Sequence, residues 1–177
     1  MTSLVITLIG PDRPGIVSAV SDAATAHGAN WTDSLMANFA GQFAGIVQLD
    51  VPGAACDALM TALRALQSPT LHITLALAPG ASAANATRRL TLDLLGHDRP
   101  GIIQSISSQL AAHGVSIDTL TTHIASGAMS GEQMFQMNAQ LTVPQALDVD
   151  TLQAALEGLA NELMVDISFD AAGATRG

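Results

Sequence analysis

Apolar and polar residues alternate in a short segment near the start of each half of the chain. Leucine or isoleucine takes every second position there: Leu4, Ile6 and Leu8, and then Leu90, Leu92 and Leu94. A period of two is typical of a strand that lies on a core. Gly10 and Gly96 follow these segments, so we predict a first strand in each half that ends at a glycine.

A helical pattern follows each of these strands. Apolar residues recur at spacings of three and four, as on the buried stripe of a helix: Val17, Val20 and Ala24, and Ile103, Ile106 and Leu110. Pro14 and Pro100 suit a first helical turn, where the missing N–H is no loss. Gly28 and Gly114 suit the left-handed residue after a helix, so both ends of each helix are marked.

The remainder of each half has the pattern of two strands, a helix and a last strand. We predict paired strands at 30–38 and 45–51 around Gly41, and at 115–125 and 134–143 around residues 127–131. Helices at 54–66 and 150–163 and closing strands at 71–77 and 165–169 complete the halves. The order βαββαβ is that of the ferredoxin-like sandwich, in which two helices cover one face of a four-stranded antiparallel sheet. The predicted class is therefore α+β.

The two halves are copies of one unit. The segment LVITLIGPDRPGIV starts at Leu4 and LTLDLLGHDRPGII starts at Leu90, an offset of 86, and Ala26-His27-Gly28 recurs as Ala112-His113-Gly114 at the same offset. The stretch between the copies is rich in small residues and lacks periodicity. We predict a first unit at 1–79, a linker at 80–88, a second unit at 89–170 and a disordered tail at 171–177.

Charge limits the classes of partner. The 177 residues include 15 Asp and Glu against six Arg and no Lys, for a net charge of −9. Nucleic-acid binding needs a cationic surface, so we expect no direct nucleic-acid binding, and any effect on transcription would pass through a protein partner. No apolar run approaches the roughly 20 residues of a membrane-spanning helix, and the N-terminus lacks signal-peptide features. We expect no membrane association and a cytoplasmic location.

No pattern in the sequence predicts catalysis. His97 and His123 stand outside any His-x-x-x-His arrangement, and the single cysteine, Cys56, can form neither an internal disulfide nor a thiolate metal site. A phosphate loop of the Walker or dinucleotide type is also absent. We therefore expect no catalytic residues, no metal, no cofactor and no enzymatic activity.

The turn between the first strand and the first helix is the candidate binding site. Free N–H groups at a helix N-terminus favour an anion, and a glycine such as Gly15 allows close approach. Asp12 can accept from an ammonium group, so the turn suits both ends of an amino acid. A simpler alternative is that Asp12 and Asp98 only cap the helix by accepting from the N–H of Gly15 or Gly101. Arg13 and Arg99 likewise can pair with surface acids instead of a ligand.

The Asp-Arg-Pro-Gly-Ile turn, inside a βαββαβ unit of about 80 residues, resembles the ACT domain, a regulatory module that binds amino acids. The resemblance covers nearly the whole chain, twice, and a freestanding pair of ACT units resembles the glycine cleavage system transcriptional repressor family of accessory regulators. It implies that an Asn near the start of the second strand faces the turn. Asn30 occupies that place in the first copy and Ser116 in the second, so we expect the first copy to be the one that binds.

Two sets of ligand-binding residues follow. In the first copy they are Gly10, Pro11, Asp12, Arg13, Pro14, Gly15, Ile16 and Asn30. In the second copy they are Gly96, His97, Asp98, Arg99, Gly101 and Ser116. The resemblance alone implies a small ligand such as glycine or serine.

The leading hypothesis is a ligand-responsive regulator that acts through a protein partner, with units or chains packed through their exposed sheet edges, which also allows a homodimer. The alternatives are a ligand-free adaptor and a detached regulatory subunit of an amino-acid metabolic enzyme.

Overall fold

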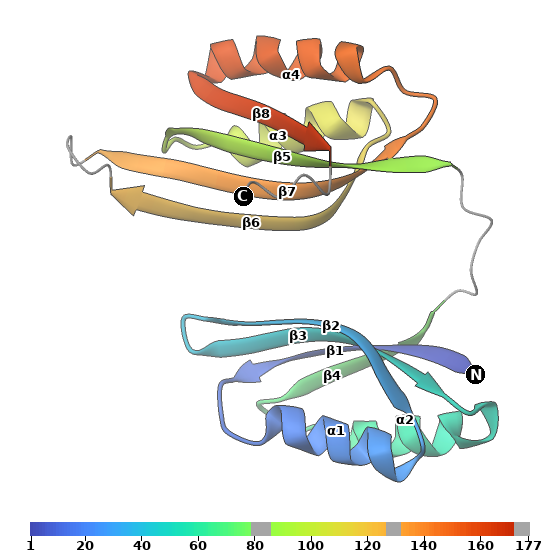
Figure 1. The fold of residues 1–177 in the computed structure, drawn as a ribbon. Helices are drawn as coiled ribbons and strands as arrows, with labels where there is room; N and C mark the ends of the chain where they lie inside the picture. Colours follow the sequence, from blue (N-terminus) through green and yellow to red (C-terminus); the bar gives the residue numbers. More distant parts are fainter. Residues whose placement is uncertain (79–85, 127–131, 172–177) are drawn as a thin grey trace, which may run out of the picture. The chain divides into compact units, whose positions relative to one another are not determined.

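The computed structural model describes residues 1–78, 86–126 and 132–171. The chain divides into two units, 1–82 and 83–177, and each has a core of its own (Figure 1).

Both units have the predicted order of elements. The first contains β1 (Thr2–Pro11), α1 (Ile16–Ala26), β2 (Asn30–Phe39), β3 (Gln42–Val51), a short 3-10 turn η1 (Gly53–Ala55), α2 (Cys56–Ala65) and β4 (His72–Leu77). The second contains β5 (Thr87–His97), α3 (Ile102–Ala112), β6 (Ser116–Ser126), β7 (Gln133–Pro144), α4 (Val149–Leu163) and β8 (Val165–Ala171). The four strands are ordered β2-β3-β1-β4 and β6-β7-β5-β8, with antiparallel neighbours. The predicted α+β class and the ferredoxin-like topology are confirmed.

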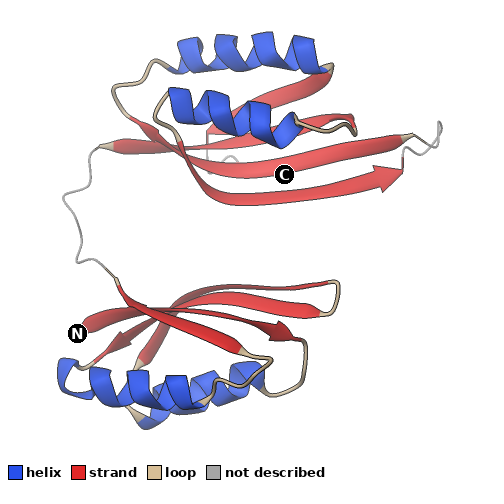
Figure 2. Ribbon diagram, turned by 180° about the vertical axis from the view of Figure 1, so that it is seen from behind, coloured by secondary structure: helices blue, strands red, loops and turns tan. Residues whose placement is uncertain are grey.

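In each unit both helices lie on the same face of the sheet, and the other face carries no helix (Figure 2). The first core forms where alternate residues of β1, namely Leu4, Ile6 and Leu8, meet the buried stripes of α1 and α2. The second core has the same plan around β5. The alternation of apolar and polar residues in β1 and β5 therefore predicted correctly which face of each sheet is buried.

The buried stripe of the first helix differs from the prediction by one residue at its start. Val17 is 42% exposed, whereas Ile16 is only 5% exposed and packs in the core with Val20 and Ala24. In the second unit Ile102 takes the equivalent buried place, and Ile103 is only partly buried. The reason is that each helix begins directly after a left-handed glycine, which sets its rotation relative to the sheet.

The strands adjoining the linker and the tail are longer than predicted. Thr87 and Arg88, expected in the linker 80–88, belong to β5 and pair with Pro144 and Val143. Ala171, expected in the tail 171–177, pairs with Leu90 as the last residue of β8. The rest of that tail (172–177), most of that linker (80–85) and the expected hairpin turn at 127–131 lie outside the described residues.

Candidate functional site

The turn after β1 is held in place by its backbone. Gly10 is buried where β1 passes β4, and a Cβ atom there would lie 2.5 Å from the carbonyl oxygen of Thr70. The N–H of Asp12 donates to the carbonyl of Gly41 in the β2-β3 hairpin turn, at 2.9 Å. Gly15 then adopts a left-handed conformation, φ +94°, from which α1 starts. The turn is thus fixed by contacts with the segment before β4 and with the hairpin.

Asp12 contacts the sheet and does not cap the helix. Its Oδ2 atom accepts a hydrogen bond from Nδ2 of Asn38, at 2.6 Å. Gly15 and Gly101 stand at the N-caps of α1 and α3, and within the described residues their N–H groups donate no hydrogen bond to Asp12 or Asp98. The simple capping role considered for Asp12 and Asp98 is therefore wrong.

The structure does not bring Asn30 to the turn of its own unit. Asn30 pairs with Asp50, which pairs in turn with Ser3 near the start of β1. The turn follows the other end of β1, and the stretch from Ser3 to Gly10 spans roughly 23 Å at about 3.3 Å per residue. The asparagine that contacts the turn is Asn38, near the end of β2.

A hollow of about 140 Å³ lies beside the turn, at the start of α1. Its lining residues come from the turn, from α1 and from the segment between α2 and β4: Arg13, Pro14, Gly15, Ile16, Ala19, Val20, Leu66 and Leu71. Four of the eight residues predicted for the first copy therefore line it, while Gly10, Pro11, Asp12 and Asn30 do not. Leu66 and Leu71 were not predicted from the sequence, because only the folded chain brings the end of α2 and the segment after it against the first turn of α1.

Two features of the hollow favour an anion. The first N–H groups of α1 have no intrahelical acceptor, as at every helix start, and the helix dipole adds to their positive character. The guanidinium group of Arg13 is exposed and has no hydrogen bond or ion pair within the described residues. The apolar wall formed by Ile16, Leu66 and Leu71 limits the contact of such an ion with water.

The turn of the second unit has the same backbone but different side-chain contacts. Gly101 has φ +96°, and the N–H of Asp98 donates to the carbonyl of Gln133, at 2.9 Å. The guanidinium of Arg99 instead donates to the carbonyl of Glu162 near the end of α4, at 2.9 Å. His97 lies 3.5 Å from the Glu132 carboxylate.

The asparagine contact of the first unit has no counterpart in the second. At the offset of 86 the position of Asn38 is held by Ile124, and Ser116 pairs with Thr142 at the far end of the sheet. The two turns therefore have the same backbone conformation but differ in the hydrogen bonds that their side chains form.

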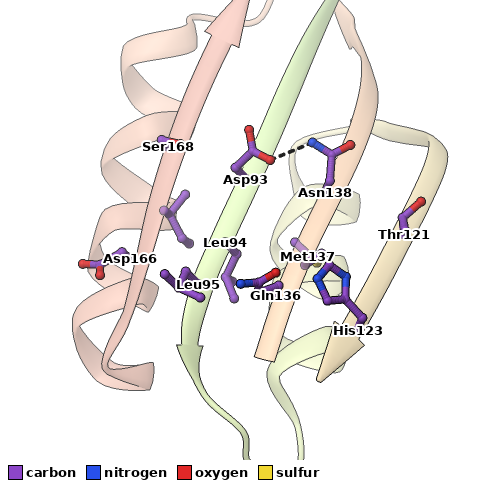
Figure 3. Close-up of a pocket in the computed structure, with 11 residues that line it drawn as sticks. Asp93, Leu94, Leu95, Thr121, His123, Gln136, Met137, Asn138, Asp166 and Ser168 are labelled. Carbon is purple, nitrogen blue, oxygen red and sulfur yellow. Dashed lines mark hydrogen bonds between the residues drawn. The ribbon is translucent and has the colours of Figure 1, made fainter. Parts of the chain in front are cut away.

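The helix-free face of the second sheet carries a different kind of hollow, about 340 Å³ in volume (Figure 3). Polar side chains from all four strands surround it: Asp93, Thr121, His123, Gln136, Asn138, Asp166 and Ser168. Nδ2 of Asn138 donates to Oδ1 of Asp93, at 2.7 Å. The signal for this face was present in the sequence, because polar residues occupy alternate positions along β5, β7 and β8.

The described residues contain no group of three or more His, Cys, Asp or Glu side chains placed to hold a metal ion. Among their helices, none combines the length and the apolar character needed to span a membrane.

The chain is thus a tandem repeat of one βαββαβ unit, in which the helix after the first strand starts at a left-handed glycine. The chain belongs to the ACT domain family, whose model matches residues 2–75 and again residues 88–170. No match is found among curated protein sequences.

Two solved structures resemble the whole chain. A protein of unknown function from Galdieria sulphuraria is 30% identical, with 97% of this chain and 98% of that chain covered and a TM-score of 0.80. A candidate glycine cleavage system transcriptional repressor is 21% identical, with 96% of each chain covered and a TM-score of 0.67. The second likeness concerns the fold alone, and it agrees with the tandem arrangement expected from the sequence.

Proposed function

We propose that this protein is a non-catalytic regulatory protein that binds a small amino acid at the turn of its first unit and transmits the binding event to a protein partner. The observation that carries the proposal is the hollow of about 140 Å³ at the start of α1. Arg13 lines this hollow, and its guanidinium group has no hydrogen bond or ion pair within the described residues. ACT family membership supports a regulatory role for both units.

The carboxylate of the ligand is the end that the hollow recognises. Arg13 supplies a planar pair of donors for a carboxylate, and the free N–H groups of α1 add further donors. Gly15 has no side chain, and no atom beyond its two chain neighbours lies within 4 Å of the position that a Cβ would take there, so the backbone is open to a ligand.

The ammonium end of the ligand needs an acceptor outside the hollow. Asp12 is the residue before Arg13, and its carboxylate is exposed and oriented by Asn38. We assign the ammonium to Asp12, at the mouth of the hollow. A volume of about 140 Å³ is well below the roughly 300–1,000 Å³ of sites for drug-sized ligands, which favours glycine or serine over larger amino acids.

We propose that the protein acts on its target through a protein partner. A net charge of −9 opposes direct contact with phosphate backbones, so an effect on transcription would pass through a regulator that itself contacts DNA. The fold likeness to a candidate glycine cleavage system transcriptional repressor supports an output at that level. Exposed edge strands β2 and β6 offer places for such a partner or a second chain to add.

A thermal-shift screen with the twenty proteinogenic amino acids tests the proposal. A ligand that binds only the folded form raises its stability, by about 2.7 kcal/mol at a concentration 100 times the Kd. We expect one or more small amino acids at millimolar concentration to raise the melting temperature. Absence of a shift with any of them would contradict the proposal and favour a ligand-free adaptor.

A matched pair of arginine variants identifies the site. Arg13→Ala should abolish the shift, whereas Arg99→Ala, at the equivalent position of the second unit, should keep it. The reverse result would place the site in the second unit.

A further inference from the structure

The tip of the β2-β3 hairpin is bonded to the turn after β1 at two points, and both bonds involve Asp12. The carbonyl of Gly41 accepts from the N–H of Asp12, at 2.9 Å. Nδ2 of Asn38 donates to the carboxylate of the same residue, at 2.6 Å. Asp12 is also the residue to which the proposed function assigns the ammonium group of the amino acid. One residue therefore contacts the hairpin and takes part in the proposed site.

The hairpin tip is a two-residue turn that is strained at one position. Phe39 and Gln42 are the last pair of the β2-β3 ladder, and Ala40 and Gly41 between them have φ of +50° and +79°. Such turns favour Asn or Gly at their central positions, because the left-handed conformation brings a Cβ atom too close to a carbonyl oxygen. Alanine at position 40 therefore favours opening of the tip, whereas the two bonds to Asp12 oppose it.

The hairpin tip lies at the edge of the first sheet and outside its core. β2 pairs with β3 alone, and Phe39 at the end of β2 is 72% exposed. Segments with few buried contacts open locally at a lower free energy than the whole fold. Opening of the tip would therefore loosen the end of edge strand β2, which is one of the places where a partner can add.

Asp12 can contact the amino acid and the hairpin at the same time. A carboxylate has two oxygen atoms, each of which can accept a hydrogen bond. Oδ2 accepts from Asn38, and Oδ1 has no hydrogen bond within the described residues. An ammonium group bound to Oδ1 leaves the bond to Asn38 in place, so the amino acid and the hairpin do not compete for Asp12.

The second unit has only part of this arrangement. It keeps the backbone bond, from the N–H of Asp98 to the carbonyl of Gln133, at 2.9 Å. The position of Asn38 is held there by Ile124, which is 54% exposed. The guanidinium of Arg99 connects the second turn to α4 instead. A link through side chains between the turn and the hairpin is therefore found in the first unit and not in the described part of the second.

We propose that the β2-β3 hairpin is the element through which the first unit transmits binding: an amino acid held by Asp12 keeps the hairpin tip closed and so orders the end of edge strand β2. Opening of the tip withdraws Asn38 and the carbonyl of Gly41 from Asp12, and the amino acid then loses an oriented carboxylate. A ligand shifts an equilibrium between two states by its difference in affinity for them, and here the closed state binds better. The inference rests on the proposed function and adds the part of the protein that responds.

Amide hydrogen exchange of the full chain, resolved by residue with NMR, tests the role of the hairpin. The reporters are the backbone amides of residues 38–43, and the probe is glycine or serine, whichever raises the melting temperature, at a saturating concentration. We expect exchange of these amides to slow by about three- to tenfold, which is the range that one hydrogen bond contributes to affinity. Amides at 124–126 and 133–135, beside the hairpin of the second unit, should be unchanged.

Two variants separate the bond to Asn38 from the strain at Ala40. Asn38→Ile introduces the residue that the second unit carries at this position. With enough glycine or serine to saturate it, this variant should still show the thermal shift but no slowing of exchange at 38–43, and Asn38→Ala should behave in the same way. Ala40→Gly removes the strain, so it should slow exchange of these amides by about threefold or more without any amino acid.

Three results would overturn the role of the hairpin. They are a thermal shift of the wild type without slower exchange at 38–43, the same slowing in both Asn38 variants as in the wild type, and exchange that Ala40→Gly leaves unchanged. The amide spectrum of each variant shows whether the fold is retained. A thermal shift without slower exchange rejects the hairpin alone, whereas the absence of any shift rejects the proposed function and this inference together.

Discussion

Nδ2 of Asn38 donates a hydrogen bond of 2.6 Å to Oδ2 of Asp12, although the two residues are 26 positions apart in the chain. The contact links the β2-β3 hairpin to the turn that leads into α1, next to the backbone bond between Asp12 and Gly41. Ile124 holds the equivalent position in the second unit and offers no such donor. The second unit therefore lacks this side-chain hydrogen bond between the hairpin and the turn.

Loss of this contact should weaken the proposed amino-acid site more than it weakens the fold. Asn38→Ala leaves Asp12 without its orienting donor, and a typical intramolecular hydrogen bond contributes about 0.5–1.5 kcal/mol, or up to roughly tenfold in affinity. We expect an affinity loss of three- to tenfold by isothermal titration calorimetry, with the amino acid found by thermal shift. Asn161→Ala, a change of an exposed Asn on α4, is the control and should bind normally.

The two equivalent arginines should differ in their effect on stability without any ligand. Arg99 donates to the carbonyl of Glu162 near the C-terminus of α4, where a cation also complements the helix dipole. Arg99→Ala should therefore lower the free energy of unfolding of the second unit by about 0.5–1 kcal/mol. Arg13→Ala should leave stability within error, because Arg13 has no such contact within the described residues. Urea denaturation of both variants measures the difference, and equal losses would contradict it.

Gly10 is expected to be essential for packing, whatever its role in binding. A Cβ there would lie 2.5 Å from the carbonyl oxygen of Thr70, so the backbone of the segment before β4 would have to move away from β1. Gly10→Ala should destabilise the first unit by about 1–3 kcal/mol. Gly158→Ala is the matched control, since its Cβ on α4 meets nothing within 4 Å, and it should stabilise by about 0.5–1 kcal/mol. Urea midpoints that move in the same direction would refute this account.

Local patterns predicted most of the fold, because strand and helix periods are local properties. The alternation around Ile6 predicted β1, and the repeat at an offset of 86 predicted the second unit from the first. The buried stripe of α1 was predicted to begin at Val17 but begins at Ile16, because the rotation of the helix depends on the left-handed Gly15 that precedes it.

The candidate site was predicted less completely because it depends on long-range packing. Asn30 was chosen from its place at the start of the second strand, but α1 returns the chain to the far end of the sheet before β2 begins, so the end of β2 reaches the turn and Asn38 takes that place. Leu71 joins the hollow from the segment before β4, and no local pattern contains that contact.

Stability of the second unit should depend on pH through Asp148, the N-cap of α4. Its carboxylate accepts from the hydroxyl of Thr151, at 2.8 Å, and from the N–H of Asp150, at 3.2 Å, and these bonds hold the pKa of Asp148 below its ordinary value of 3.8. A carboxyl whose pKa is lower in the folded state stabilises the fold above its unfolded-state pKa and loses that contribution as the pH falls through the folded value. Asp148→Asn keeps a capping side chain but removes the charge. We expect the wild type to melt at a higher temperature than this variant at pH 7, and the difference to shrink as the pH falls below about 4. A difference that stays constant from pH 7 to pH 2 in thermal melts would show that the charge of Asp148 contributes nothing to the cap.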